Sequence, residues 1–224
     1  MAKAMVGVAG MAPVVLRIAR VRGSGARPIF ARRYGVLSRR AEHGEVGKRR
    51  RALLAHASGR VLDLGVGTGE SFKHLPSAVS ELVAIDRDPL MLRQARRRLD
   101  EASVPIRLVR GEGERLPFAD ATFDSAIVAL VLCTVDDPAA TVAELHRVLR
   151  RGGRLLMMEH VRAADGTLAH WQDRLQRPWS WLNGGCRPNR ATVDTVEAAG
   201  FRIERLERYG FDVLPHVQCV AVRP

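Results

Sequence analysis

A buried strand that runs directly into a glycine-rich turn constrains this chain more than any other feature. The stretch VLDLGVGTGE at residues 61–70 begins with apolar residues and continues with a glycine at every second position, Gly65, Gly67 and Gly69. Glycines permit left-handed backbone conformations and let the main chain approach a ligand closely. In an open α/β sheet, ligands bind at turns that follow the carboxyl ends of the strands. The stretch therefore predicts a ligand site at the end of a central strand.

Strands and helices alternate along the rest of the chain. We expect strands at residues 60–64, 81–86, 106–111, 123–132 and 154–161, helices at 88–102 and 137–153, and a closing hairpin of two late strands. The strands are continuous apolar runs, which indicates a sheet buried on both faces. Helices between such strands indicate βαβ units. The sequence predicts an α/β fold with a doubly wound, Rossmann-like, mostly parallel sheet and a late antiparallel strand.

The spacing of the glycines narrows the choice of ligand. A dinucleotide fingerprint reads G-x-G-x-x-G, and Glu70 stands where its third glycine would be. A carboxylate there would repel a pyrophosphate. Asp86 ends the next strand, where a carboxylate can accept both hydroxyls of a ribose. The pattern favours a nucleoside cofactor without phosphates, for which S-adenosylmethionine is the common example; an ordinary tight turn is the alternative.

Composition limits the partners. The 224 residues carry a net charge of +12, and nearly all of the 36 basic residues are arginine. Such a charge suits nucleic acid or anionic lipid, but the arginines are spread along the chain, and general arginine usage explains them equally well. The three cysteines have no C-x-x-C spacing and the seven histidines no H-x-x-x-H pair. We therefore expect no metal, no disulfide framework and a reducing, cytoplasmic setting.

The chain divides into a short N-terminal tail and one domain. Residues 1–27 contain an apolar run that is shorter than the roughly 20 residues needed to span a bilayer. We expect a disordered tail or a weak amphipathic contact with a membrane surface. Residues 28–224 form the domain, which opens with a basic helical segment. An insertion at residues 163–199, between the fifth and sixth strands, holds all three tryptophans.

Four stretches resemble the class I S-adenosylmethionine-dependent methyltransferases, in the right order: VLDLGVGTG, AIDRDPLML, GEGERLPFADATFD and ELHRVLRRGGRLL. By this resemblance Asp63 would hold the ammonium of the cofactor, Asp86 its ribose and Glu112 its adenine amine. The full set of cofactor-binding residues that it implies is Asp63, Gly65, Gly67, Gly69, Asp86, Arg87, Glu112, Gly113, Leu130 and Val131. The product would be S-adenosylhomocysteine. Many relatives have alanine at the position of Gly113, whose backbone amide is retained.

A narrower resemblance is to the methyltransferase-like seven branch, whose animal members are membrane-associated alkyl thiol methyltransferases. The stretches that carry it are VALVLCTVDDP, MMEHV, the W-Q-x-x-L-x-x-P-W core, GGCRPNR and LPHV. It implies methyl transfer to a small apolar acceptor, above all a thiol. The animal members have a longer N-terminal anchor, so peripheral membrane contact is left open here.

Three other readings of the chain's activity and assembly stay open. The acceptor could be a lipid head group, a quinone or another natural product. The charge allows a second class, an RNA-binding protein or RNA methyltransferase. We expect little nucleic-acid binding, because the aromatic residues form one apolar stripe instead of a stacking surface on a basic sheet. Monomer and homodimer are equally compatible with the sequence.

A thiol acceptor must lose its proton, which a neutral imidazole can accept. His160, at the end of the fifth strand, is the leading candidate, followed by Asp136 and His216; each could equally be an ordinary hydrogen-bonded residue. Cys133 is expected to be buried apolar filler, and Cys186 to be exposed.

Aromatic residues are the candidates for substrate binding. Tyr34 is expected to stack over the cofactor. Trp171, Trp179 and Trp181 are the other candidates. Trp171 and Trp179 recur at helical spacing with Leu168, Leu175 and Leu182, and this stripe suits a lid over an apolar substrate, a membrane contact or plain core packing. Pro178 should break or kink this helix.

Overall fold

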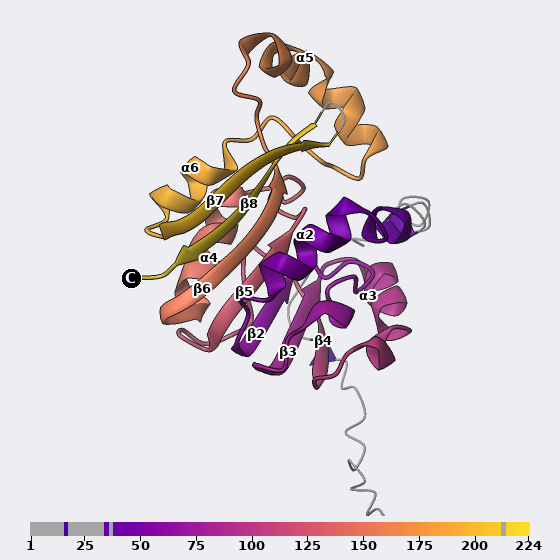
Figure 1. The fold of residues 1–224 in the computed structure, drawn as a ribbon, viewed down its shortest axis with the longest axis vertical. Helices are drawn as coiled ribbons and strands as arrows, with labels where there is room; N and C mark the ends of the chain where they lie inside the picture. Colours follow the sequence, from indigo (N-terminus) through magenta and orange to yellow (C-terminus); the bar gives the residue numbers. More distant parts are fainter. Residues whose placement is uncertain (1–15, 18–33, 36–37, 212–213) are drawn as a thin grey trace, which may run out of the picture.

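The computed structural model describes residues 16–17, 34–35, 38–211 and 214–224. In this part of the chain one sheet has the strand order β1-β4-β3-β2-β5-β6-β8-β7 (Figure 1). The strands are β1 (Leu16–Arg17), β2 (Gly59–Leu64), β3 (Val79–Asp86), β4 (Ile106–Arg110), β5 (Phe123–Ala129), β6 (Leu149–His160), β7 (Arg202–Phe211) and β8 (Leu214–Val222). Strands β1 to β6 pair in parallel, and β8 pairs antiparallel with both β6 and β7. The predicted fold class is confirmed.

The strand order reverses its direction between β2 and β5. From β2 the chain moves outward to β3 and β4, and it then returns to lay β5 and β6 on the other side of β2. Such a reversal opens a crevice at the carboxyl ends of the two central strands. The glycine turn follows β2 at this crevice, which is where the sequence predicts a ligand site.

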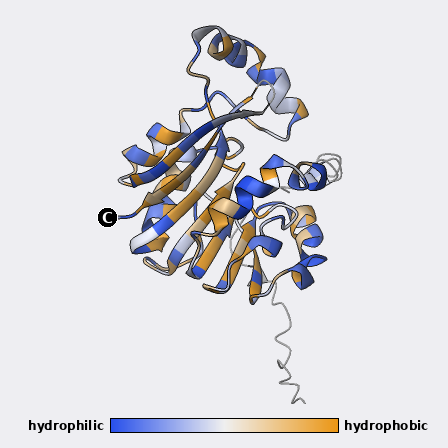
Figure 2. Ribbon diagram, viewed as in Figure 1, coloured by the Kyte–Doolittle hydropathy of each residue, from blue (hydrophilic) through white to orange (hydrophobic). Residues whose placement is uncertain are grey.

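Helices cover both faces of the sheet. The bounds of the helices are α2 (Glu45–Leu54), α3 (Pro89–Arg96), α4 (Pro138–Val148), α5 (Gly166–Leu182) and α6 (Thr192–Ala198), with 3-10 turns η1 (Phe72–His74) and η2 (Leu99–Glu101). All of these helices except α5 pack on the sheet (Figure 1). Helices α2 and α3 pack on one face and α4 and α6 on the other (Figure 1). Alternate strand residues feed the two cores: Val61 points to the α2 side and Leu62 to the α4 side. Figure 2 shows the resulting apolar strands between more polar helices.

Several elements end earlier than their apolar patterns predict. The helix expected over 137–153 ends at Val148, because Leu149 is fully buried and pairs with Phe123 as the start of β6. Helix α3 ends at Arg96 and continues only as a 3-10 turn. The strand expected to reach residue 132 ends at Ala129, because Leu130 has a positive φ of 61°. This turn redirects the chain into the crevice.

The N-terminal helical segment is interrupted. Residues 38–42 are helical, a turn follows at 43–44, and α2 begins at Glu45. The turn brings Gly47 so close to the carbonyl oxygen of Glu42 that a side chain at Gly47 would collide with it. Of the predicted tail, only Leu16–Arg17 are described, paired with β4. The expectations of disorder or membrane contact for the rest of residues 1–27 lie outside the described residues.

The segment between β6 and β7 holds α5 and α6, which behave differently. Helix α6 packs beside α4 on the sheet, whereas α5 stands away from the sheet beyond the end of β6 (Figure 1). Helix α5 continues through Pro178, where we expected a break or a kink. None of the helices in the described ranges is long and apolar enough to cross a membrane.

Candidate functional site

A cavity of about 250 Å³ lies at the carboxyl ends of the central strands. Its lining comes from the loops after β2, β3, β4 and β5, from the end of β6 and from the last turn of α5. Predicted site residues in the lining are Tyr34, Gly65, Gly67, Asp86, Arg87, Glu112, Gly113, Leu130, Val131, His160 and Trp179. Those outside it are Asp63, Gly69, Asp136, Trp171, Trp181 and His216. Residues from separate stretches of sequence therefore meet at one space.

The glycine turn forms one wall of the cavity. Gly65 has a φ of 68° and Gly67 a φ of 55°, backbone angles that side chains disfavour. A Cβ at Gly65 would collide with Val131, and a Cβ at Gly67 would lie 3.7 Å from the ring of Tyr34. Gly69, in contrast, faces the ring of Phe72. The structure therefore gives Gly69 a packing role outside the lining.

Asp86 fastens this turn to the end of β3. Its Oδ2 accepts a hydrogen bond from the backbone N–H of Gly67 at 2.9 Å, and its Oδ1 accepts one from Asp88 at 2.8 Å. Burial raises the pKa of Asp86 to about 6, although these two backbone hydrogen bonds oppose the shift. The carboxylate thus combines a structural contact with a position in the cavity wall.

Asp63 lies just beneath the wall, at the end of β2. It is 2% exposed, and its Oδ2 has no hydrogen-bond partner among the described residues. Burial raises the pKa of Asp63 to about 7, opposed by Arg50 and by a hydrogen bond from Ser71. A buried carboxylate oxygen without a partner is costly, so Asp63 is a candidate to contact a polar or cationic ligand group.

The other walls come from the loops after β4 and β5. Glu112 and Gly113 follow β4, and a side chain at Gly113 would press on Thr141 and Leu64. Leu130 and Val131 follow β5. These residues therefore share the wall of one cavity, and their role in cofactor binding stays a prediction.

Asp136, the second candidate base, lies outside the cavity. Its side chain is 79% exposed and its Oδ2 lies 3.4 Å from Nη1 of Arg87. Arg87 lines the cavity, but Asp136 does not. The chain turns at Leu130, where β5 ends, and Asp136 lies at the surface.

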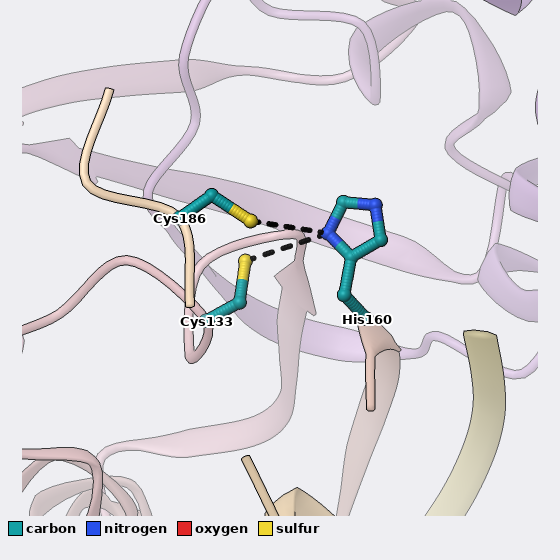
Figure 3. A group of neighbouring side chains, drawn as sticks. All are labelled: Cys133, His160 and Cys186. Atoms are coloured by element: carbon teal, nitrogen blue, oxygen red, sulfur yellow. Dashed lines mark hydrogen bonds between the residues drawn. The ribbon is translucent and has the colours of Figure 1, made fainter. Parts of the chain in front are cut away.

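Two cysteines, Cys133 and Cys186, approach His160 (Figure 3), and all three residues line the cavity. Nδ1 of His160 lies 3.7 Å from Sγ of Cys133 and 3.6 Å from Sγ of Cys186. The pKa of Cys186 is lowered through its hydrogen bonds with Cys133 and His160, whereas the pKa of Cys133 is raised by Cys186 and by burial. Cys186 is only 5% exposed, so the expectation that it is exposed was wrong. The segment after α5 folds back along the cavity wall, and this path buries the side chain of Cys186.

Glu159 holds the Cys133 loop in place, a function that we did not predict. Its fully buried carboxylate accepts hydrogen bonds from the backbone N–H groups of Val131 at 2.6 Å, Leu132 at 2.7 Å and Cys133 at 3.3 Å. Burial raises the pKa of Glu159 to about 7 against these donors. One acidic residue inside an apolar strand, LLMMEHV, was the available signal.

His216 supports His160 from behind. The two rings are 4.4 Å apart between centroids, and Nδ1 of His216 lies 2.8 Å from the carbonyl oxygen of Leu214. Tyr209 stacks on the other side of His216, 5.3 Å away, and the guanidinium of Arg49 lies 4.0 Å above Tyr209. Burial lowers the pKa of His216 to about 4, and His160 adds to the effect. His216 is therefore a neutral neighbour of His160 outside the cavity.

The aromatic candidates separate into two groups. Tyr34 and Trp179 line the cavity, and burial raises the pKa of Tyr34 to about 12. Trp171 is 51% exposed and Trp181 is 84% exposed, on the same helix as the exposed Leu175 and Leu182. Plain core packing is thus wrong for Trp171 and Trp181. Trp179 alone among the tryptophans faces the cavity.

Comparison with known proteins agrees with this architecture. A family described as "Methyltransferase domain" matches residues 62–157. Thiol S-methyltransferase TMT1B of Homo sapiens is 33% identical over 181 residues, which cover 76% of this chain and 74% of that protein. The ubiquinone/menaquinone biosynthesis C-methyltransferase of Syntrophotalea carbinolica is 35% identical over 87% of this chain and 89% of that protein.

A solved structure extends the likeness to the fold. The N-methyltransferase NodS of Bradyrhizobium japonicum, in complex with S-adenosyl-L-homocysteine, superposes with a TM-score of 0.65. It is 18% identical, and the superposition covers 85% of this chain and 98% of that one. The strand order, the glycine turn and these relatives lead to one assignment. The chain belongs to the class I S-adenosylmethionine-dependent methyltransferases and resembles their methyltransferase-like seven branch.

Proposed function

We propose that this protein transfers a methyl group from S-adenosylmethionine to a small apolar thiol, with S-adenosylhomocysteine as the second product. The observation that carries the proposal is one cavity whose lining includes the glycine turn and Asp86 together with His160 and two cysteines. The first group suits a nucleoside cofactor, and an imidazole suits a thiol that must ionise. Similarity to a thiol S-methyltransferase supports the same acceptor.

Residues of the cavity wall, together with Asp63 outside the lining, suit the groups of S-adenosylmethionine. Asp63 offers a buried carboxylate oxygen without a described partner, suited to the ammonium of the cofactor. Asp86 offers a carboxylate to the ribose, and Gly67 leaves open the space that a side chain would fill. Glu112 would accept from the adenine amine. When bound, this cofactor supplies a methyl group activated by a positively charged sulfonium sulfur.

The residues of the chain contribute chiefly position and exclusion of water. Leu130, Val131 and Trp179 give the cavity apolar walls, and Tyr34 covers the glycine turn. Holding two reactants in the right geometry can supply much of the rate of a displacement. His160 is the candidate base that lines the cavity, and its imidazole can accept the proton of a thiol.

A quinone or another lipid-soluble acceptor is the second candidate. The exposed side chains of Trp171, Leu175, Trp181 and Leu182 give apolar surface to α5, whose last turn lines the cavity through Trp179. Aromatic and apolar side chains of this kind suit contact with a membrane surface, from which such an acceptor would come. The quinone-pathway relative supports the same alternative.

An RNA substrate has weaker support. Several arginines that raise the net charge are held in ion pairs with carboxylates, including Arg50 with Glu42 and Arg98 with Glu70. Arg147 likewise pairs with Glu144. These charges are less available to phosphates than the overall composition suggests.

The test is methyl transfer from labelled S-adenosylmethionine to three acceptors in parallel: a short alkyl thiol, a quinone in vesicles and bulk RNA. We expect label on the thiol, lost in Asp86→Ala. Label on the quinone or RNA alone would contradict the thiol assignment. If the wild-type protein labels none of the three acceptors, the proposed activity is contradicted.

A further inference from the structure

Three metal-binding side chains converge at one end of the cavity. Sγ of Cys133, Sγ of Cys186 and Nδ1 of His160 all lie within 4.8 Å of one another (Figure 3). Cys133 lies in the loop after β5, His160 at the end of β6 and Cys186 in the loop after α5. All three residues line the cavity. Neither the cysteine nor the histidine spacing predicts such a group, and we expected no metal.

The distances match those around a tetrahedral zinc ion. Zinc–sulfur bonds of about 2.3 Å and zinc–nitrogen bonds of about 2.05 Å at a tetrahedral angle separate sulfur from nitrogen by about 3.6 Å. The two sulfurs lie 3.7 and 3.6 Å from Nδ1 of His160. Both thiols therefore stand at the separation that two thiolates would have from a histidine on the same ion.

Hydrogen bonding also joins Cys133 to Cys186, but it does not account for the approach of both sulfurs to one ring nitrogen. Both cysteine sulfurs approach the same ring nitrogen. A neutral imidazole nitrogen has either one lone pair or one hydrogen, so it can form a well-directed bond with only one of them. A cation between the three atoms would bind all of them at once. Two thiolates would also neutralise a divalent ion inside a largely buried site.

The three ligands are already held in place. Glu159 binds the backbone N–H of Cys133, and the backbone N–H of Arg187 donates to the carbonyl oxygen of Cys133 at 2.7 Å. This second bond joins the loop after β5 to the residue that follows Cys186. The ring of His160 packs against His216. Preorganised ligands of this kind reduce the entropy lost when an ion binds.

We propose that Cys133, His160 and Cys186 bind one zinc ion, whose fourth coordination position opens into the cavity and accepts the sulfur of a thiol substrate. A structural zinc site usually has four protein ligands, whereas a catalytic site has three and one open position. The group has three ligands and lines the cavity of the proposed reaction. This arrangement matches the second kind of site.

The thiol role rests on the proposed function, whereas the metal site does not. When a thiol binds, its S–H bond breaks, a zinc–sulfur bond forms, the proton passes to water and any zinc-bound water leaves. No electron is transferred, so no oxidant or reductant is required. Zinc deprotonates a coordinated thiol, and soft sulfur is preferred to the carbon or oxygen of a quinone. His160 then acts as a ligand, and the site selects thiols as a class of acceptor.

The first test measures metal directly. Full-length protein is loaded with Zn²⁺ or Co²⁺, dialysed, and analysed for metal content and for its absorption spectrum. We expect one ion per chain, tetrahedral cobalt bands and a thiolate-to-cobalt charge-transfer band. Cys133→Ser and Cys186→Ser should lose the ion, whereas Cys219→Ser, which changes a buried cysteine outside the cavity, should retain it. Absence of a stoichiometric ion or of the charge-transfer band in the wild type would overturn the proposal, whether or not the variants fold.

The second test probes the open position. A short alkyl thiol added to the cobalt protein should strengthen the charge-transfer band, because a third sulfur joins the ion. An unchanged spectrum would contradict the open position. Thiol methylation by fully metal-free protein would contradict the metal role and leave the proposed function intact. Metal binding without any thiol methylation would contradict the proposed function while the site itself stands.

Discussion

The two ends of the cavity are built in different ways. The cofactor end combines a turn and an aspartate from neighbouring strands, β2 and β3, joined by the hydrogen bond from Gly67 to Asp86. The acceptor end brings together Cys133, His160 and Cys186, which lie on three elements and are fixed by Glu159 and by the segment after α5. The proposed cofactor site therefore rests on a local motif, whereas the proposed acceptor site depends on how distant segments meet. If this comparison is right, changes at one end should leave binding at the other largely intact.

The largest expected effect comes from the cofactor end. Asp86→Ala removes the carboxylate proposed to bind the ribose and the acceptor for Gly67. Loss of charge-assisted hydrogen bonds should weaken S-adenosylhomocysteine binding about 100-fold or more. Isothermal titration calorimetry measures this, with Asp120→Ala as the control, because Asp120 is an exposed partner of Arg147. Unchanged affinity in a folded Asp86→Ala protein would remove Asp86 from the site.

The acceptor end should respond in the opposite way. His160→Asn should reduce kcat/KM for a thiol by about 100-fold, the lower end of the range for a lost acid–base group, while cofactor affinity changes less than about threefold. His146→Asn is the matched control, since His146 lies on α4 against Phe201 and outside the cavity. A parallel loss of cofactor binding in His160→Asn would show that the two ends are not independent.

A third prediction uses the pH dependence of cofactor affinity to test the cofactor end alone. The pKa of Asp86 is raised to about 6 and that of Asp63 to about 7, mainly by burial. Their anionic forms are proposed to bind the cofactor, so affinity should fall tenfold or more as the pH falls from 8 to 5. Titrations across this range measure it, and Asp63→Asn should flatten the upper part of the curve. A flat wild-type curve would contradict the roles of both carboxylates.

Neighbouring charges adjust the pKa values of Asp63 and Asp86, and the same two groups affect the stability of the cofactor-free protein. Arg50 lowers the pKa of Asp63 and Arg87 that of Asp86, whereas Asp88 raises the pKa of Asp86 and Asp86 that of Asp63. Because both pKa values are raised by folding from an ordinary 3.8, these groups stabilise the cofactor-free protein most below pH 3.8. That contribution is lost as the pH rises through about 6 to 7. Thermal melting with and without cofactor separates the two effects.

The same contrast explains what the sequence could predict. The alternation of strands and helices, the glycine turn and the position of Asp86 follow from local apolar runs and spacing, which is why the fold class could be predicted and why the turn and Asp86 were expected at one site. The positive φ of Leu130 could not be predicted; β5 ends there, and Asp136 lies at the surface. The path of the chain after α5 brings Cys186 back to Cys133 and buries it. No local sequence pattern indicates this path, and we therefore expected Cys186 to be exposed. Contacts between distant segments have no periodic signal.

The smallest expected effect concerns the tryptophans. Trp179 lines the cavity, and Trp181 is 84% exposed. Trp179→Phe removes part of an apolar wall and should raise KM for an alkyl thiol by about threefold to tenfold, equivalent to roughly 1 kcal/mol of lost burial. Trp181→Phe should leave KM within about twofold in buffer. If Trp181→Phe weakens activity only when the acceptor is in vesicles, the exposed face of α5 contributes to delivery of the acceptor. Equal effects of both changes in buffer would show that α5 closes further over the cavity, which would make the acceptor end more adaptable than the cofactor end.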